Sequence, residues 1–273
     1  MSLGDNYDPE AYNPEAGGSA DAPASGLLST RRLTWRIGGV AIVDGVSIDL
    51  AEGEFLAVIG PNGAGKTSLF NLISGLRRPS DGSVSLDGHD LTRLPPHRRA
   101  RLGLGRTFQS SSVFASLSVA ANVRLAVQAR RGGSIRPFPW PGRDRDIAER
   151  ADRVLWRVGL DHRAAALAGT LAHGEKRKLE IALLLAGEPR VLLLDEPMAG
   201  VSAEDVPGLV ALIRSLTRDE RRSVLMVEHH MDVVLDLADR VAVMHHGALL
   251  VCDTPEVVMA DRTVQEAYLG EKL

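Results

Sequence analysis

A glycine-rich stretch between two apolar segments constrains the fold of this chain more than any other feature. It reads Gly60-Pro61-Asn62-Gly63-Ala64-Gly65-Lys66-Thr67, which is a glycine, four free positions and then Gly-Lys-Thr. Residues 55–59 before it form a short apolar run that suits a buried parallel strand. The apolar spacing of residues 68–76 after it suits a helix that begins at Gly65. A chance glycine-rich turn is the alternative, and it leaves this strand–turn–helix context unexplained.

The residue types of this loop indicate how it would hold phosphate. Glycines let the backbone wrap closely, so that successive N–H groups point at phosphate oxygens, and the helix N-terminus adds partial positive charge. Lys66 can neutralise the β- and γ-phosphates of a nucleotide, and the Thr67 hydroxyl can ligate Mg²⁺. We therefore expect the loop and the helix start that follows it, residues 60–68, to bind nucleotide phosphates, with Ser68 as the last of these residues.

A second apolar strand ends in two adjacent carboxylates. Residues 191–194 are apolar, and Asp195 and Glu196 follow them directly. A strand buried on both faces cannot keep an unpaired charge in its middle, and ligands of open α/β sheets bind at the carboxyl ends of the strands. We expect Asp195 to hold Mg²⁺ and Glu196 to act as a general base on water. The alternative is a surface Asp-Glu-Pro turn that merely closes a strand.

Composition limits the class of protein. The 273 residues are 44% hydrophobic and 25% charged, values typical of a soluble protein with one large or two small domains. A single cysteine excludes an internal disulfide, no apolar run approaches the roughly 20 residues of a membrane span, and no signal peptide is recognised. These features predict a cytosolic protein. The cluster Arg98, Arg99 and Arg101 is interpreted as a solvated helix face, with contact to a membrane subunit as the alternative.

Charge is distributed unevenly along the chain. Residues 1–26 contain five acidic and no basic side chains, so removing them changes the net charge from −3 to +2. This opening is rich in Gly, Pro, Ala, Ser and Asp and has no apolar period, which predicts a disordered acidic tail. The nearly neutral remainder, 27–273, gives no electrostatic reason to expect binding to nucleic acid.

The order of predicted elements indicates an α/β fold with a mainly parallel sheet. Residues 27–50 and 83–91 alternate as strands around Gly-rich turns, which predicts a small antiparallel β layer. A helical subdomain is expected at about 112–188, interrupted by an Arg-, Gly- and Pro-rich connection at 130–145. Beyond it, helices and strands alternate as in a P-loop NTPase, with helices at 174–186, 204–217 and 231–238 and strands at 191–195, 223–228 and 240–244.

Three further segments resemble motifs of the ATP-binding subunits of ABC transporters, and the resemblance covers essentially residues 27–273. The segment 105–109 resembles the Q-loop, 227–229 resembles the strand-end switch histidine, and the signature is matched by Leu171-Ala172-His173-Gly174-Glu175. The resemblance implies ATP and Mg²⁺ as cofactors. It implies that Gln109 touches Mg²⁺ and the attacking water, and that His229 contacts the γ-phosphate and orients Glu196.

The signature is expected to open a helix, whose N-terminal N–H groups form an anion site. In the family, this site faces the γ-phosphate bound by the opposite subunit, so two chains sandwich two ATP molecules. The alternative is a plain helix N-terminus. The chain departs from the family pattern where Ile37 replaces the aromatic residue that stacks on adenine, and Trp35 on the same strand face is a candidate substitute. Ala172 lacks the usual hydroxyl, and Ser202 replaces an aspartate.

Several stretches resemble the branched-chain amino-acid importer subfamily, at 101–109, 173–182, 198–201 and 264–270. The resemblance implies import of branched-chain amino acids or related amides or urea. It also implies two transmembrane permeases, a second ATPase that makes a homodimer or heterodimer, an external binding protein, and a place at the cytoplasmic face of the membrane. Two alternatives stay open, namely a lipopolysaccharide-type exporter ATPase and a soluble ABC protein that acts on DNA or ribosomes.

Overall fold

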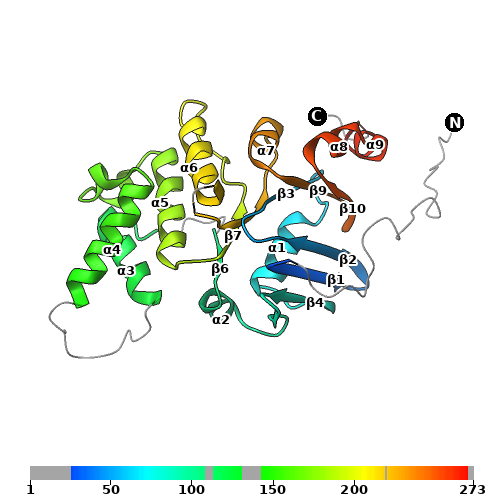
Figure 1. The fold of residues 1–273 in the computed structure, drawn as a ribbon, viewed down its shortest axis with the longest axis horizontal. Coiled ribbons are helices and arrows are strands. Elements are labelled where there is room, and N and C mark those ends of the chain that lie inside the picture. Colours follow the sequence, from blue (N-terminus) through cyan, green and yellow to red (C-terminus); the bar gives the residue numbers. More distant parts are fainter. Residues whose placement is uncertain (1–25, 108–112, 131–142, 219, 270–273) are drawn as a thin grey trace.

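The computed structural model of the chain describes residues 26–107, 113–130, 143–218 and 220–269 (Figure 1). The predicted acidic tail at 1–26 therefore lies outside the described residues except for Gly26, as do Gln109 and most of the connection at 130–145. The described chain forms two sheets with helices packed between and around them.

The larger sheet has six strands in the order β10-β9-β3-β8-β7-β6. Its parallel strands are β3 (Phe55–Ile59), β6 (Leu104–Arg106), β7 (Val191–Asp195), β8 (Ser223–Val227) and β9 (Arg240–His245). All residues of β3, β7 and β8 are buried, because helices or the second sheet cover both faces. The mainly parallel sheet is as predicted. The strand β6 and the antiparallel edge strand β10 (Ala248–Asp253) were not predicted.

The smaller sheet is antiparallel, with the order β2-β1-β4-β5, and it confirms the predicted β layer. Its strands are β1 (Leu28–Ile37), β2 (Val40–Leu50), β4 (Asp81–Leu86) and β5 (His89–Asp90). The helix α1 (Lys66–Ser74) shares a hydrophobic core with this sheet and with one face of the larger sheet. That core fixes the direction in which α1 leaves the end of β3.

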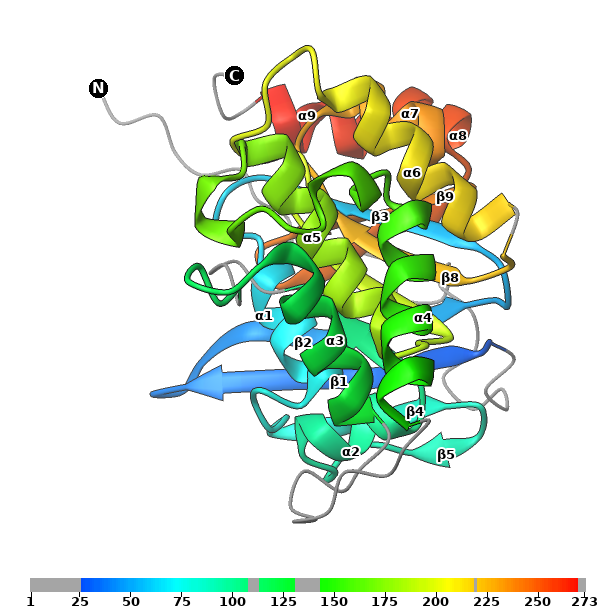
Figure 2. The same cartoon turned by 90° about the vertical axis from the view of Figure 1, so that its left-hand side faces the viewer.

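The opposite face of the larger sheet carries most of the other helices. They are α3 (Val119–Arg130), α4 (Arg143–Arg157), α5 (His173–Ala186), α6 (Val206–Arg218) and α7 (Met231–Leu237), followed by α8 (Pro255–Ala260) and α9 (Arg262–Leu269). Figure 1 shows α3, α4 and α5 grouped at one end of the molecule, and Figure 2 shows the same helices facing the viewer. One hydrophobic core joins them to α6 and to the sheet. Within the described ranges, no helix is long and apolar enough to span a bilayer. The division at residue 27 and the helical subdomain at about 112–188 stay predictions.

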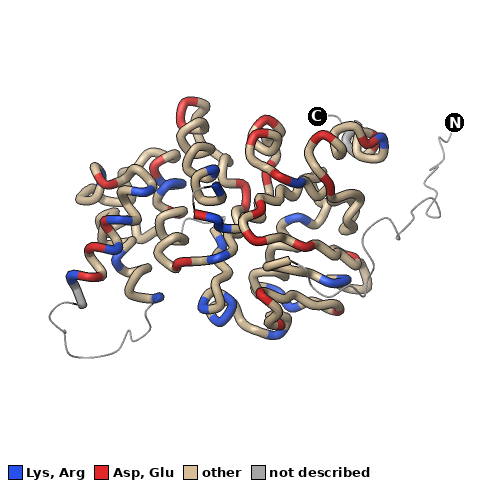
Figure 3. Tube along the Cα trace, viewed as in Figure 1, with Lys and Arg blue, Asp and Glu red and all other residues tan. Residues whose placement is uncertain are grey.

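The short helix α2 (Pro96–Arg101) carries a cluster of basic residues (Figure 3), and one of them is buried. Arg98 and Arg101 are exposed, as expected, but Arg99 is only 1% exposed, so the interpretation of a wholly solvated face was wrong. The Arg99 guanidinium donates to the carbonyl oxygens of Leu72 (2.8 Å) and Ile73 (2.6 Å) at the end of α1. Carbonyls at a helix C-terminus lack intrahelical donors, and a cation there also complements the helix dipole.

Arg99 stays charged at neutral pH despite its burial. Burial lowers its pKa to about 10, which is still well above neutrality. Its remaining donors reach the carbonyl oxygens of Leu94 (2.9 Å) and Thr92 (3.0 Å). Arg99 therefore ties the segment before α2 to the end of the helix that follows the glycine-rich loop.

Replacing Arg99 by Met is expected to destabilise the fold by on the order of 3 kcal/mol, because several buried carbonyl oxygens would lose their donors. The free energy of unfolding in urea measures this loss. Arg98→Met, an exposed change on the same helix, is the control and should cost less than about 0.5 kcal/mol. Equal urea midpoints for the two variants would contradict the role given to Arg99.

Candidate functional site

The glycine-rich loop joins β3 to α1 and is pressed against neighbouring backbone. Gly60, Gly63 and Gly65 have φ values of 147°, 81° and 97°, in the region that favours glycine. A Cβ atom on Gly60 would collide with the carbonyl oxygen of Met244, and one on Gly65 would lie 2.6 Å from that of Ile42. The first and last glycines are therefore required both by conformation and by space.

The turn between β9 and β10 supports this loop from behind. The Gly247 amide donates to the Ala64 carbonyl (3.1 Å), and the Gly247 carbonyl accepts from the Asp44 amide on β2 (2.8 Å). The turn thus fixes the loop relative to both sheets. The local sequence His245-His246-Gly247 is typical of a polar turn and does not by itself indicate contact with the loop.

Lys66 lies folded along the loop that it follows. Its Nζ donates to the carbonyl oxygens of Gly60 (2.5 Å) and Pro61 (2.9 Å), and the residue is only 6% exposed. A positive charge is therefore held inside the ring of backbone that the sequence predicts to bind phosphate. Thr67 and Ser68, both half-buried, complete the first turn of α1. A phosphate chain would exchange carbonyl partners of Lys66 for its own oxygens.

The strand order β3-β8-β7 brings the other predicted residues to the same edge of the sheet. The Glu196 amide donates to the Val227 carbonyl (2.9 Å), so the chain after β7 is attached to the end of β8. Glu196 Oε1 lies 2.9 Å from His229 Nε2. Their side chains are 30% and 41% exposed, so water reaches both. The structure brings together the predicted general base and the predicted switch histidine.

Asp195 forms a buried ion pair that the sequence analysis missed. Its Oδ2 accepts from Arg106 Nη2 (2.9 Å), and the two side chains are 0% and 8% exposed. Burial raises the pKa of Asp195, while Arg106 acts in the opposite direction. Burial likewise lowers the pKa of Arg106 against the attraction of Asp195. Arg106 ends the short strand β6, and no local pattern around it indicates its partner, although a buried cation requires an anionic or carbonyl partner.

The surroundings of Asp195 fit a hard cation. Its Oδ1 is buried and has no hydrogen-bond partner among the described residues. Mg²⁺ prefers oxygen ligands and is commonly held by one or two protein groups together with substrate phosphates. In the described ranges no cluster of three or more His, Cys, Asp or Glu side chains could hold a metal by itself. Asp195 and Thr67 could hold Mg²⁺ together with a bound nucleotide, while Gln109 lies outside the described residues.

Glu228 is a second buried carboxylate that sequence reasoning missed. It is 1% exposed, and it accepts from the amides of Met198 (3.2 Å) and His229 (3.0 Å). Its Oε1 also lies 2.8 Å from Nδ1 of His230. Glu228 therefore connects the loop after β7 to the loop after β8. The available signal was an acidic residue at the end of the apolar run 224–227.

The predicted signature begins α5 as expected. The amide of Ala172 donates to Glu175 Oε2 (3.1 Å), so Glu175 closes the helix start although Ala172 has no hydroxyl. Ala172 and His173 are exposed, whereas Gly174 is buried, and a Cβ there would lie 2.7 Å from Asp205 Oδ2. The exposed first turn can present its amides to an anion outside this chain.

One arginine joins the signature helix to the carboxylate loop. Arg177 Nη2 donates to the carbonyl oxygens of Glu196 (3.3 Å) and Ala199 (3.4 Å). Its Nη1 also donates to Glu180 one turn along the helix (2.8 Å). The start of α5 and the backbone of the predicted general base are therefore held together within one chain.

The residues predicted to bind the adenine base lie near the turn that connects β1 to β2. Exposure rises along β1 from buried Leu33 through half-buried Trp35 to Ile37, which is 54% exposed. The guanidinium of Arg77 lies 5.9 Å from the centroid of the Trp35 ring. Contact of Trp35 or Ile37 with a nucleotide base stays a prediction.

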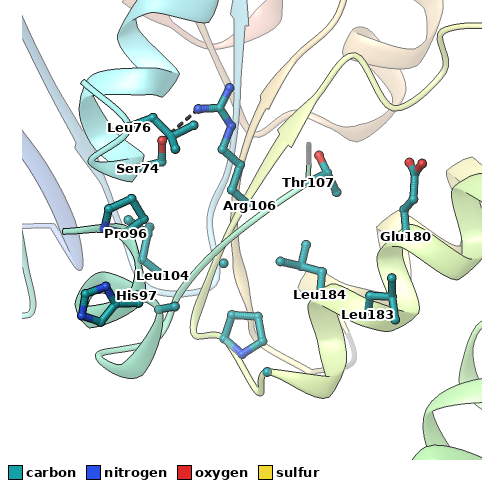
Figure 4. Close-up of a pocket in the computed structure, with 14 residues that line it drawn as sticks. Ser74, Leu76, Pro96, His97, Leu104, Arg106, Thr107, Glu180, Leu183 and Leu184 are labelled. Carbon is teal, nitrogen blue, oxygen red and sulfur yellow. Dashed lines mark hydrogen bonds between the residues drawn. The ribbon is translucent and has the colours of Figure 1, made fainter. Parts of the chain in front are cut away.

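A groove of about 360 Å³ lies between α2 and α5, beside the strand β6 (Figure 4). Its apolar lining includes Leu76, Leu104 and Leu184. Arg106 also lines it and points toward α1, where it bonds to Ser74. Arg106, which pairs with Asp195, therefore also lines a surface groove. No local sequence pattern indicated this groove.

Comparisons of the sequence and of the structure with known proteins all find proteins of ABC transporters. A family model described as ABC transporter matches residues 43–199. The high-affinity branched-chain amino acid transport ATP-binding protein BraF of Pseudomonas aeruginosa is 38% identical over 90% of this chain and 98% of its own length. The lipopolysaccharide export system ATP-binding protein LptB of Haemophilus influenzae is 35% identical over 90% and 98%. The ADP conformation of an ATP-binding cassette of an ABC transporter superposes with a TM-score of 0.79, at 29% identity over 90% of this chain and 99% of that one.

The family match covers more than half of the chain, and the relatives align with nearly all of it. The likeness to the solved cassette extends over the mainly parallel sheet, the antiparallel sheet and the helices of this chain. Both the sequence likeness and the fold lead to the same conclusion. This chain belongs to the ABC transporter family, in which it is an ATP-binding subunit that hydrolyses ATP.

Proposed function

We propose that this chain powers an importer of branched-chain amino acids or of related amides or urea. The named relative in Pseudomonas aeruginosa supports this substrate class, as does the likeness of residues 101–109 and 173–182 to that subfamily. The observation that carries the catalytic part is the 2.9 Å contact between Glu196 Oε1 and His229 Nε2, next to the phosphate loop. The likeness to a lipopolysaccharide export protein supports export as the second candidate.

Binding begins at the loop between β3 and α1. Backbone amides of residues 60–68 surround the phosphates, and Lys66 exchanges the carbonyls of Gly60 and Pro61 for phosphate oxygens. Trp35 and Ile37 would lie against the base. Asp195, Thr67 and Gln109 would hold Mg²⁺, which neutralises charge on the β- and γ-phosphates when it is bound.

Hydrolysis is assigned to the groups at the ends of β7 and β8. Glu196 accepts a hydrogen bond from the attacking water and takes its proton as the water oxygen bonds to the γ-phosphorus, while the bond from that phosphorus to the bridging oxygen breaks and ADP leaves. His229 fixes the orientation of the Glu196 carboxylate by their direct contact. Glu228 restrains both loops, because it binds the amides of Met198 and His229. Holding Glu196 and His229 in fixed positions lowers the entropic cost of bringing the carboxylate and the water into a reactive orientation.

The exposed signature is proposed to complete the site of a second ATPase subunit. Ala172, His173, Gly174 and Glu175 begin α5, and the helix N-terminus suits an anion such as the γ-phosphate. In this arrangement two chains enclose two ATP molecules, and closure of the dimer moves the attached transmembrane permeases. An external binding protein would deliver the substrate, and the ATPase would work at the cytoplasmic face of the membrane.

Replacing Glu196 by Gln should leave ATP binding intact and lower turnover by at least about 100-fold, because the amide cannot accept the proton of water. Phosphate release at saturating ATP measures turnover, and calorimetry measures binding. Glu149→Gln, an exposed change on α4, is the control and should behave as the wild type. Wild-type hydrolysis in Glu196→Gln would remove the general-base assignment.

Lys66→Ala should weaken ATP binding by about tenfold or more, since a buried charge-assisted contact with phosphate is lost. Titration calorimetry with ATP and Mg²⁺ gives the affinity directly. Arg262→Ala removes an exposed cation on α9 and serves as the control for the change in net charge. Unchanged affinity in Lys66→Ala would contradict the phosphate-loop assignment.

The transport assignment is tested by the proteins that accompany the chain. The chain is tagged in its native cell, membranes are solubilised gently, and copurifying proteins are identified by mass spectrometry. Two different permeases with a second ATPase are expected, and the associated binding protein then identifies the substrate. Lipid-export partners, or only ribosomal or DNA-associated proteins, would overturn amino-acid import and leave the ATP chemistry standing.

A further inference from the structure

Arg106 is held in one orientation by contacts on several sides. Its Nη1 donates to Asn71 Oδ1 and to Ser74 Oγ on α1, each at 2.8 Å. Its guanidinium also lies 5.8 Å from the ring centroid of Phe70. The planar guanidinium makes its bonds in a fixed fork, so these contacts leave Nη2 directed at Asp195 Oδ2. The arginine is therefore a rigid support anchored on the helix that follows the phosphate loop.

The neighbouring residue holds the backbone of Asp195 as well. The Thr107 amide donates to the Leu193 carbonyl (3.0 Å), and Thr107 Oγ1 accepts from the Asp195 amide (3.2 Å). The end of β6 thus binds Asp195 through both its main chain and its carboxylate. Only Oδ1 of that carboxylate remains unpartnered among the described residues.

We propose that Arg106 is a positioning residue that fixes the Asp195 carboxylate so that Oδ1 is presented to Mg²⁺. The proposal rests on the metal-binding role given to Asp195 in the proposed function. With Oδ2 engaged by Arg106, the carboxylate loses no further rotational freedom when Oδ1 accepts a metal ion. Supports of this kind around metal ligands typically change metal affinity by about 10- to 100-fold when they are removed.

A purely structural ion pair is the competing explanation. Buried pairs often contribute little net stability, and removing one partner destabilises the fold by leaving the other charge uncompensated. Such a pair would affect folding without a specific effect on the metal. The experiment must therefore measure metal affinity separately from both stability and nucleotide binding.

The test uses the full chain with ADP and Mn²⁺ as a spectroscopic substitute for Mg²⁺. Electron paramagnetic resonance gives the free Mn²⁺ at half-occupancy, and calorimetry in EDTA gives ADP binding without metal. Arg106→Met should raise the Mn²⁺ requirement by about tenfold or more, with metal-free ADP binding within about twofold of wild type. Arg106→Lys should give an intermediate value, because lysine restores the charge but not the fork.

Two further variants distinguish a failure of the metal-binding role of Asp195 from a failure of the positioning role of Arg106. Arg31→Met breaks the ion pair with Asp49 (2.7 Å) away from the site and should leave Mn²⁺ affinity unchanged. Asp195→Asn should weaken Mn²⁺ binding, and wild-type affinity there would refute the metal role itself. Weak binding in Asp195→Asn with wild-type affinity in Arg106→Met would overturn only the positioning role.

A variant that spares the ion pair covers the case in which Arg106→Met does not fold. Asn71→Ala removes one anchor of the guanidinium and leaves Arg106 in place. A smaller loss of Mn²⁺ affinity with an unchanged unfolding temperature is expected. Unchanged Mn²⁺ affinity in Asn71→Ala and in Arg106→Lys would overturn the proposal.

Discussion

Burial of the three central strands on both faces determines where this protein can place charge. No residue of β3, β7 or β8 except Asp195, at the very end of β7, carries a charge, and the sheet order puts the ends of these strands side by side. Because these parallel strands are neighbours, their carboxyl ends lie at the same edge of the sheet, where ligands of open α/β sheets bind. Segments far apart in the sequence, such as residues 60–68 and the pair Glu196 and His229, meet there because the backbone pairing leaves no other position for them.

Much of the fold and the main motifs could be predicted because their signals are local. The phosphate loop, the apolar strand before Asp195 and the turn at Gly38 are each defined by neighbouring residues, and the structure places them as expected. Arg99 and Arg106 could not be assigned in this way. Arg99 binds backbone carbonyls, which every residue possesses, and the partners of Arg106 lie 32 to 89 positions away in the chain. Only the tertiary fold brings such groups together.

At two positions, Ala172 and Ile37, this chain lacks the side chain that is typical of the family, and a neighbouring residue lies close to each position. Ala172 provides no hydroxyl at the start of α5, yet the helix begins there, because Glu175 accepts from the Ala172 amide. Similarly, the aromatic ring near the hairpin end belongs to Trp35 rather than to position 37, and it lies deeper in the fold than Ile37. A different side chain therefore caps α5, while contact of Trp35 with a nucleotide base stays a prediction.

The bonds from Arg177 to the Glu196 and Ala199 carbonyls offer a route of communication between two nucleotide sites. In the proposed dimer, α5 meets the nucleotide of the partner, while Glu196 acts on the nucleotide of its own chain. One guanidinium thus links the two sites, so a displacement of α5 by the state of one nucleotide displaces the backbone that aims water at the other. In that dimer, a nucleotide bound at one site would change the affinity of the other site for nucleotide, and the two effects on binding free energy would be equal.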